Sequence, residues 1–400
     1  MNDLMPLLLR EFHQSCGARF MAVQGMEVIA DFGDVSAERD ALRESAGILD
    51  FSFRGRLCLV GADRARFLHG QVTNDVKKLR PGEGCYAALT TAKGKMQSDL
   101  NIFALQDELL LDFEPGLAEA VRQRLEKFIV ADDVQVVDTA PHYGLLSVQG
   151  PKADAAVRAL GLFPELPDKP LASCKVSDAM FGDVYLMSNP RLSQSRVQSP
   201  KSKVTDNSSG TIAKDSGLWT QDSGLARLNG FDLFVPTNFL TAVADKLVAA
   251  VKAVGGRTCG WTAFEIVRIE AGIPRFGADM DETNIPIECG IESRAISYTK
   301  GCYIGQEVLN RIHSIGHVNR EFCGLRIETK ADKLPARGEK LFHEGKEVGY
   351  ITSTTFSPAF RGVIALGYVR REFNQPGAKF ILQGSDGAIT EAFVRTSAIP

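Results

Sequence analysis

The pattern of apolar residues changes near residue 322, and this change limits what the chain can fold into. Before it, strand-like runs such as Arg56–Gly61 and Leu109–Phe113 alternate with helix-like spacing, as in Gly116–Phe128 and Thr237–Val254. After it, short strand-like runs follow one another with glycines between them. Mixed elements followed by strands alone predict an α+β body and, at residues 322–400, a C-terminal β-barrel domain.

Local signals refine the expected body. Ser36–Ala46 has helical spacing with Ser36 as the expected N-cap, and a further helix is expected at 261–271. The segment Gly84–Phe103 has the pattern of a hairpin, with its turn at Thr91–Lys95. Gly94 lies in that turn and is expected to take a positive φ.

One segment, Ser188 to Asp222, breaks the alternation. It is rich in Ser, Lys, Gln and Asp and has almost no apolar spacing before Leu218. Such a composition cannot bury enough surface to offset the entropy of ordering, so the sequence predicts a mobile insertion near 188–222 that the fold can lose. We expect it to interrupt the second part of the body, at 151–321, with the first part at 1–150.

Composition restricts the class of protein. The formal net charge of −3 argues against a dedicated nucleic-acid-binding protein. The apolar run Met5–Leu9 is too short for a signal peptide, and no later run approaches a membrane span, so the sequence predicts a cytoplasmic protein that does not bind membranes. We also expect a monomer. The eight cysteines include no C-x-x-C pair, which leaves no metal-ligand run in the sequence.

The densest group of chemically active residues is K-G-C-Y-I-G-Q-E at 300–307. Gly301 and Gly305 allow a tight turn around Cys302. Lys300 precedes the thiol, and basic residues downstream would favour the thiolate if the chain folds back; these are Arg311, His313, His317 and Arg320. A buried, inert sulfur beside Tyr303, ahead of a helix that begins at Gln306 and Glu307, is the other interpretation.

Two histidines, His313 and His317, are four residues apart and would share one face of a helix. Gly316 lies between them and no acidic third ligand is evident. We therefore favour a shared surface face over a metal site.

The motif K-G-C-Y-x-G-Q-E resembles the signature of the YgfZ family, folate-dependent proteins of iron–sulfur cluster synthesis and repair. Much of the remaining chain resembles the parent superfamily, the glycine-cleavage T-protein or aminomethyltransferase. The supporting stretches are Ala46–Phe51, Phe67–Val76, Gly230–Asp232, Arg268–Gly272, Met280–Ile287 and Gly349–Pro358. This resemblance implies an aminomethyltransferase-like ring of three domains around a central folate channel.

The resemblance also implies site residues. T-proteins carry G-G-x-x-D-D near the reacting folate nitrogens; here Asp99 remains and Ser98 replaces the other acid. Asp99 is expected to bind the pterin or shuttle a proton, or else to be a solvated turn acid. The T-protein G-F-E, whose Glu holds the pterin, corresponds to G-F-D ending at Asp232. A carboxylate suits this role because the pterin edge donates two parallel hydrogen bonds.

Three further residues fall where the family presents groups near folate. Arg268 lies in R-I-E-A-G and either meets acids in the channel or supports its own helix; we favour support. Asn74 and Tyr86 are candidate folate contacts, with packing in the hairpin as the other interpretation.

The expected cofactor is tetrahydrofolate or a one-carbon derivative, and the expected partners are iron–sulfur client proteins or assembly factors. In this hypothesis Cys302 and Asp99 are the reactive groups, and any cluster is bound transiently. The alternative is a tetrahydrofolate-dependent aminomethyltransferase of the glycine cleavage type; a weaker third is a folate-binding regulator without thiol chemistry. Loss of the acid at Ser98 and the presence of the cysteine motif favour the first hypothesis.

Overall fold

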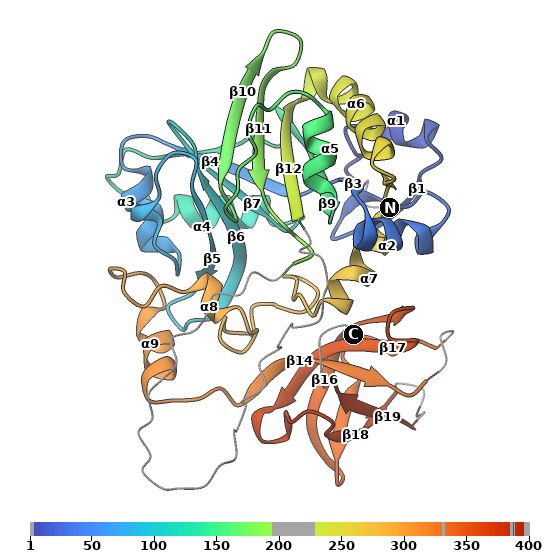
Figure 1. Ribbon diagram of the computed structural model, residues 1–400. Coiled ribbons are helices and arrows are strands. Elements are labelled where there is room, and N and C mark those ends of the chain that lie inside the picture. Colours follow the sequence, from blue (N-terminus) through green and yellow to red (C-terminus); the bar gives the residue numbers. More distant parts are fainter. Residues whose placement is uncertain (1–3, 194–228, 330–332, 385–386, 388, 396–400) are drawn as a thin grey trace, which may run out of the picture. The chain divides into compact units, whose positions relative to one another are not determined.

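The computed structural model describes residues 4–193, 229–329, 333–384, 387 and 389–395. Contacts divide them into a body, from Met1–Gln194 and Ala226–Asn319, and a second unit that contains Arg320–Pro400. Both are drawn in Figure 1. The α+β body and the β C-terminal unit confirm the expected fold class. No helix in the described ranges is long and apolar enough to cross a membrane.

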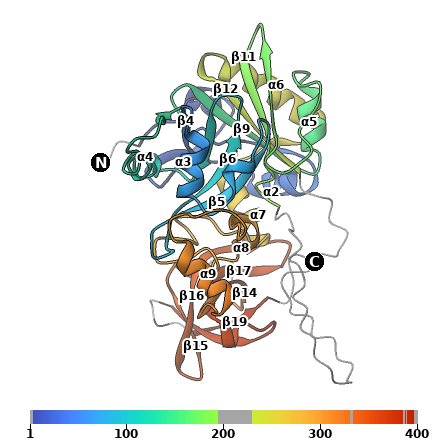
Figure 2. The same cartoon turned by 90° about the vertical axis from the view of Figure 1, so that its left-hand side faces the viewer.

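The first sheet of the body is fully antiparallel, with strands in the order β5-β6-β7-β4-β8. Its strands are β4 (Gly55–Val60), β5 (Gly84–Thr90), β6 (Met96–Ala104), β7 (Leu109–Phe113) and β8 (Gln135–Asp138). One face is apolar and packs on α3 (Arg64–Gln71) and α4 (Ala118–Glu126), through residues such as Leu68 and Leu125. Figure 2 shows these two helices covering the sheet.

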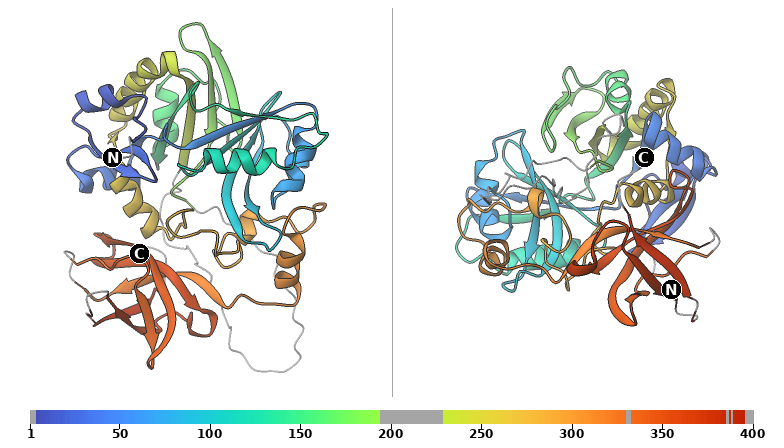
Figure 3. Two further views of the ribbon diagram at one scale, coloured as in Figure 1. Left: turned by 180° about the vertical axis from the view of Figure 1, so that it is seen from behind. Right: turned by 60° about the horizontal axis from the view of Figure 1, so that its bottom comes forward.

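The second sheet has the order β10-β11-β12-β9-β3-β13. Its strands are β3 (Gly47–Asp50), β9 (Tyr143–Gly150), β10 (Ser173–Asp178), β11 (Gly182–Ser188), β12 (Asn229–Pro236) and β13 (Arg257–Thr258). Alternate apolar residues of β9, β11 and β12 pack on α5 (Ala153–Ala159) and α6 (Leu240–Ala253). The β10–β11 hairpin extends beyond these helices, as Figure 3 shows from behind.

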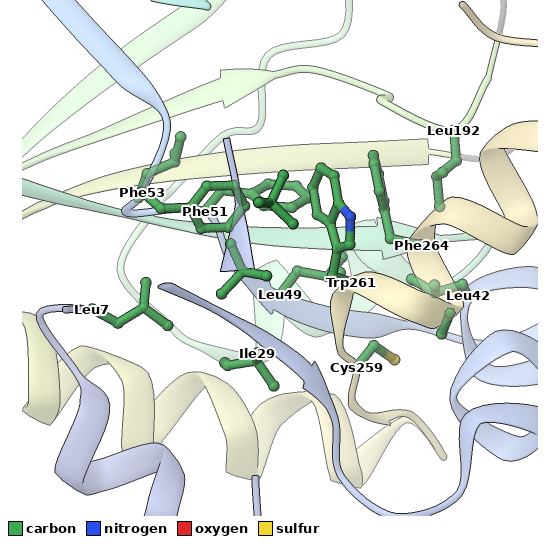
Figure 4. Packing of buried hydrophobic residues seen from close by; sticks show 14 of the residues in the cluster. Leu7, Ile29, Leu42, Leu49, Phe51, Phe53, Leu192, Cys259, Trp261 and Phe264 are labelled. Atoms are coloured by element: carbon green, nitrogen blue, oxygen red, sulfur yellow. The ribbon is translucent and has the colours of Figure 1, made fainter. Parts of the chain in front are cut away.

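The other face of the second sheet forms a core with α2 (Val35–Glu44) and α7 (Trp261–Glu270). Its aromatic centre contains Phe51, Trp261 and Phe264, with the rings of Phe51 and Phe264 5.1 Å apart (Figure 4). The remaining helices and strands of the body are α1 (Arg10–Ser15), β1 (Arg19–Val23), β2 (Met26–Asp31), α8 (Glu292–Ala295), α9 (Gln306–Ser314) and the short 3-10 turns η1 (Val76–Lys78) and η2 (Thr237–Phe239).

The C-terminal unit is a closed barrel with strand order β14-β17-β16-β15-β18-β19. The strands are β14 (Arg320–Ile327), β15 (Lys340–His343), β16 (Lys346–Ser357), β17 (Gly362–Arg370), β18 (Lys379–Gln383) and β19 (Ile389–Val394), with the 3-10 turn η3 at Arg371–Phe373. Leu325, Ile351 and Phe380 are among the residues that fill its interior. The barrel thus begins two residues before the expected boundary.

Two local expectations are wrong. The N-cap of α2 is Asp34, whose carboxylate accepts from the amide of Ala37 at 2.9 Å, and Ser36 lies inside the helix. Asp34 is preferred because an acid at this position also meets the positive end of the helix dipole. Helix α9 ends at Ser314, so His317 lies beyond it and cannot share a helix face with His313. The turn at Gly94 has the expected positive φ, +71°.

The start of the expected insertion also differs. Ser188 is the last residue of β11 and pairs with Phe231, and Leu192 is 1% exposed in the aromatic core (Figure 4). Residues 188–193 therefore belong to the body, because one buried leucine and neighbouring polar contacts hold them there. The rest of the expected insertion, 194–222, lies outside the described residues.

Leu192→Ala should lower the free energy of unfolding by about 2–4 kcal/mol, because the truncation leaves a cavity in the core. The exposed Ile315 is the matched control, since Ile315→Ala should change the stability by less than about 0.5 kcal/mol. Both effects can be measured by denaturant unfolding. Equal, negligible effects would show that residues 188–193 are not part of the core.

Candidate functional site

Alternation along the strands brings polar residues of the two sheets onto facing surfaces. On the first sheet Asn101 pairs with Asp112, and Phe103 lies two residues further on the same face. Phe103 meets Phe234 of the second sheet, with ring centroids 6.5 Å apart. Because Asp232 is two residues before Phe234 on β12, its carboxylate points to the same side.

The carboxylate of Asp232 is fully buried and is bound by two side chains. Arg191 donates to it from Nη2 at 2.7 Å and from Nε at 3.1 and 3.2 Å. Asn189 donates from Nδ2 at 2.8 Å. Both donors come from the short segment after β11, which the core residue Leu192 anchors. The carboxylate therefore has charge-assisted hydrogen bonds on both oxygens.

The same guanidinium joins the two sheets. Arg191 Nη2 donates to Oδ2 of Asp112 at 2.8 Å, and Asp112 also accepts from Arg54 and from Asn101. Burial alone would raise the pKa of Asp112, but the charges of Arg191 and Arg54 outweigh it and hold that pKa well below its ordinary value. Asp112 is therefore ionised.

The ion network continues through Glu114. Its carboxylate accepts from Arg54 at 2.5 Å and from Arg275 at 3.0 Å. Burial opposes ionisation, yet the two arginines lower the pKa of Glu114. Such buried pairs hold their members in one geometry, because removing either partner leaves an uncompensated charge.

Asp99 and Tyr86 form a second polar pair on the same surface. The hydroxyl of Tyr86 donates to Oδ2 of Asp99 at 2.8 Å, while Oδ1 is buried and has no hydrogen-bond partner among the described residues. Burial, reinforced by the charge of Glu114, raises the pKa of Asp99. Burial next to Asp99 likewise raises the pKa of Tyr86 well above its ordinary value. A buried carboxyl with a raised pKa is typical of a functional site.

Ser98 faces the opposite side of β6. It pairs with Leu89 and is fully buried on the apolar face, where its hydroxyl donates to the backbone oxygen of Asp99. Replacement of an acid at this position therefore removes no carboxylate from the polar surface. The acid that remains, Asp99, is the one that faces the site.

Asn74 and Arg268, the remaining expected folate contacts, bind other groups of the protein. Asn74 Nδ2 donates to the carbonyl oxygens of Tyr86 and Arg294 at 2.8 and 3.0 Å. Arg268 is 1% exposed; its guanidinium binds Glu265 on its own helix and Asp279 in the loop that follows. These contacts join α7 to the loop that follows it.

The motif at 300–307 runs into the first residues of α9 and contacts the end of β5, where the hydroxyl of Thr90 donates to the carbonyl oxygen of Ile304 at 2.7 Å. Lys300 Nζ donates to the carbonyl oxygens of His69, Val72 and Asn74 at 2.6, 2.6 and 2.8 Å, and so caps the C-terminal end of α3. Its burial lowers the pKa of Lys300 to about 8. The ammonium is therefore directed at the backbone of the V-T-N-D loop.

Gly305 is the N-cap of α9 with φ of +92°, and a Cβ there would lie 2.6 Å from the carbonyl oxygen of Thr91. Only glycine fits this contact with the β5–β6 turn. Cys302 is exposed and Tyr303 is buried, so the motif presents its thiol outward on a fixed backbone.

Two of the basic residues that were expected to favour the thiolate of Cys302, His313 and Arg320, interact with other groups. His313 Nδ1 lies 2.8 Å from a carboxylate oxygen of Glu292, and its ring stacks on Tyr298 at 3.8 Å. Arg320 belongs to the barrel unit, where it donates to the hydroxyl of Tyr350 at 3.1 Å. Thiolate character at Cys302 stays a prediction.

The family described as "GCVT N-terminal domain" matches residues 9–183 and 226–300, which is more than half of the chain. The family "Glycine cleavage T-protein C-terminal barrel domain" matches residues 320–394. The chain belongs to the GCVT family. It is therefore a member of the folate-dependent aminomethyltransferase superfamily, as the resemblance implied.

The chain is also similar to curated relatives and to a solved structure over most of its length. The chain is 25% identical to an aminomethyltransferase of Halalkalibacterium halodurans, over 96% of this chain and 94% of that one. It is 27% identical to an aminomethyltransferase of Shouchella clausii, over 89% and 87%. The chain is also similar to the crystal structure of the glycine cleavage system aminomethyltransferase T from Bartonella henselae. The alignment covers 100% of each chain, with a TM-score of 0.80 and 22% identity, which shows a common fold.

Five charged members of the ion network were not candidates from the sequence: Arg54, Asp112, Glu114, Arg191 and Arg275. A signal existed for Asp112, since an acid inside the apolar run L-L-L-D-F is costly to bury without a partner. Arg191 gave no such signal, because it stands in a polar stretch that resembles a surface insertion.

Asp99→Asn should raise the free energy of unfolding at pH 7 by about 1 kcal/mol, since it removes a desolvated charge. A raised pKa means that the folded state holds the proton more tightly than the unfolded state. The wild-type penalty therefore appears as the pH rises above the ordinary value of 3.8, and the advantage of the Asn variant should vanish as the pH falls toward it. Melting temperatures of both proteins across this pH range test the sign.

Proposed function

We propose that the chain binds tetrahydrofolate or a one-carbon derivative at the polar surface formed by Asp232, Asp99 and Tyr86. Two observations support the fit. Asp99 Oδ1 is a buried acceptor without a partner among the described residues, as a site for a ligand N–H requires. Asp232 already binds a planar group with parallel N–H donors, the same pattern that a pterin edge offers.

Bound tetrahydrofolate would supply a carrier for a one-carbon unit. The residues of this chain would orient and protonate: Asp232 would fix the pterin edge, and Asp99 would accept or return a proton. The raised pKa of Asp99 suits this role, because its carboxyl holds a proton more readily than an ordinary, solvated carboxyl does. Tyr86 would hold Asp99 in position through its hydroxyl.

We further propose that this folate site serves the maintenance of iron–sulfur enzymes, with Cys302 as the reactive thiol. The observation that carries the proposal is the outward position of Cys302 in the K-G-C-Y-x-G-Q-E turn, since a merely space-filling sulfur would be buried. Lys300 and Gly305 contribute by fixing the backbone on both sides of the thiol. Iron–sulfur client proteins or assembly factors are the proposed partners.

Aminomethyl transfer is the second candidate function. Relatives across nearly the whole chain are named aminomethyltransferase. The position of Ser98 on the apolar face adds weight, because the carboxylate that faces the site is retained. The cysteine motif at 300–307, in contrast, favours the iron–sulfur proposal.

Asp232→Ala should weaken binding of 5-formyltetrahydrofolate by about 1.5–3 kcal/mol, the usual loss for a charged hydrogen-bonding partner. Isothermal calorimetry measures the change directly. Asp245→Ala, on the exposed side of α6, provides a control that should leave the affinity unaltered. Identical affinities for wild type and Asp232→Ala would remove Asp232 from the site.

Cys302→Ser should abolish support of iron–sulfur enzymes in cells while leaving the affinity for folate intact, because the hydroxyl cannot replace a thiolate. Cys16→Ser, at another exposed cysteine, is the matched control. The same variants should be assayed for tetrahydrofolate-dependent release of an aminomethyl group from a lipoyl carrier. Turnover in that assay without dependence on Cys302 would favour aminomethyl transfer over the iron–sulfur proposal.

A further inference from the structure

The guanidinium of Arg191 has a position that suggests a role beyond stability. It covers the carboxylate of Asp232 with three N–H···O contacts of 2.7–3.2 Å, and it lies 5.2 Å from the ring centroid of Phe51. A planar, donor-rich group therefore rests against an aromatic ring and pairs with a buried carboxylate. This combination is what a carboxylate site for an aminopyrimidine ring would offer its ligand.

We propose that Arg191 is an internal stand-in for the ligand: its guanidinium occupies the place of the aminopyrimidine edge on Asp232, and ligand binding exchanges one planar donor for the other. The inference rests on the proposed folate site. It adds that Arg191 determines specificity, because a ligand must replace its parallel N–H donors to compete.

The two carboxylates that bind Arg191 differ in the partners that they would keep if Arg191 moved away. Asp112 keeps Arg54, at 2.7 and 3.3 Å, and Asn101, at 2.9 Å, when Arg191 leaves. Asp232 keeps only Asn189 among the contacts described above. Since an unpaired buried carboxylate is costly, the exchange is favourable only when the incoming group also donates to Asp232.

The position of Arg191 in the chain is also suitable. Leu192 is buried in the aromatic core, and Asn189 donates its backbone amide to the carbonyl oxygen of Gly230 at 2.8 Å. The backbone on both sides is therefore held, and the exchange needs only rotation of the arginine side chain. Side-chain rotation is fast compared with rearrangement of a loop.

The test compares wild type with Arg191→Ala and Arg191→Lys, using 5-formyltetrahydrofolate and methylguanidinium as probes in calorimetry. Both variants should bind 5-formyltetrahydrofolate roughly tenfold more tightly than wild type, because removing an internal competitor raises the fraction of binding-competent protein. In Arg191→Ala, methylguanidinium should raise the melting temperature and compete with 5-formyltetrahydrofolate. If Arg191→Ala does not fold, Arg191→Lys keeps the positive charge without the planar fork and carries the affinity comparison.

Arg39→Ala is the matched control. Arg39 is a buried arginine whose Nη2 donates to both oxygens of Glu270, at 2.9 and 3.0 Å, so its loss also leaves a buried carboxylate without that partner. Methylguanidinium can stabilise this variant as well, but it should not affect binding of 5-formyltetrahydrofolate. Competition restricted to the Arg191 variant would locate the exchange at Asp232.

Three outcomes overturn the inference. Simultaneous binding of methylguanidinium and 5-formyltetrahydrofolate to Arg191→Ala, or weaker folate binding by both Arg191 variants, would show that Arg191 is a structural partner while the folate site stands. No binding of 5-formyltetrahydrofolate to wild type or to either variant would overturn the proposed function and this inference together.

Discussion

A single guanidinium between two buried carboxylates determines how the site of this protein is organised. Asp112 lies on the first sheet and Asp232 on the second, and burying either carboxylate without hydrogen-bonding partners would be costly. Arg191 donates to both. The facing strand surfaces are thereby held at one spacing near the site, whereas further along the same strands the contact is apolar, through Phe103 and Phe234.

Around this bridge the polar groups differ in how completely they are paired. Asp112 and Glu114 are ionised acids with arginine partners, and their role is structural. Asp99 lies on the same face but has one oxygen without a partner and a raised pKa. Groups that cost stability in this way are often found where function needs them, and this is why we propose Asp99 as the reactive acid of the surface.

The cysteine motif combines a rigid backbone with an outward thiol. The ammonium of Lys300 donates to three carbonyl oxygens at and after the end of α3, and Gly305 allows the β5–β6 turn to approach α9 closely. Neither contact involves the sulfur of Cys302. The conservative interpretation of the motif, as a device of backbone shape, and the reactive interpretation are therefore compatible, since a fixed backbone is what presents an exposed thiol to a partner.

The sequence by itself indicated the mixture of strands and helices in the body, the change to strands alone near residue 322 and motif residues such as Asp99, Asp232 and Cys302, because local spacing and short motifs carry that information. Tertiary structure alone decided which of these residues meet. Ser98 and Asp99 are neighbours in sequence but face opposite sides of β6. Arg191 stands in a polar stretch, and its guanidinium binds Asp112 and Asp232, which are 79 and 41 residues away. Long-range electrostatic pairing of this kind leaves no periodic signal in a sequence.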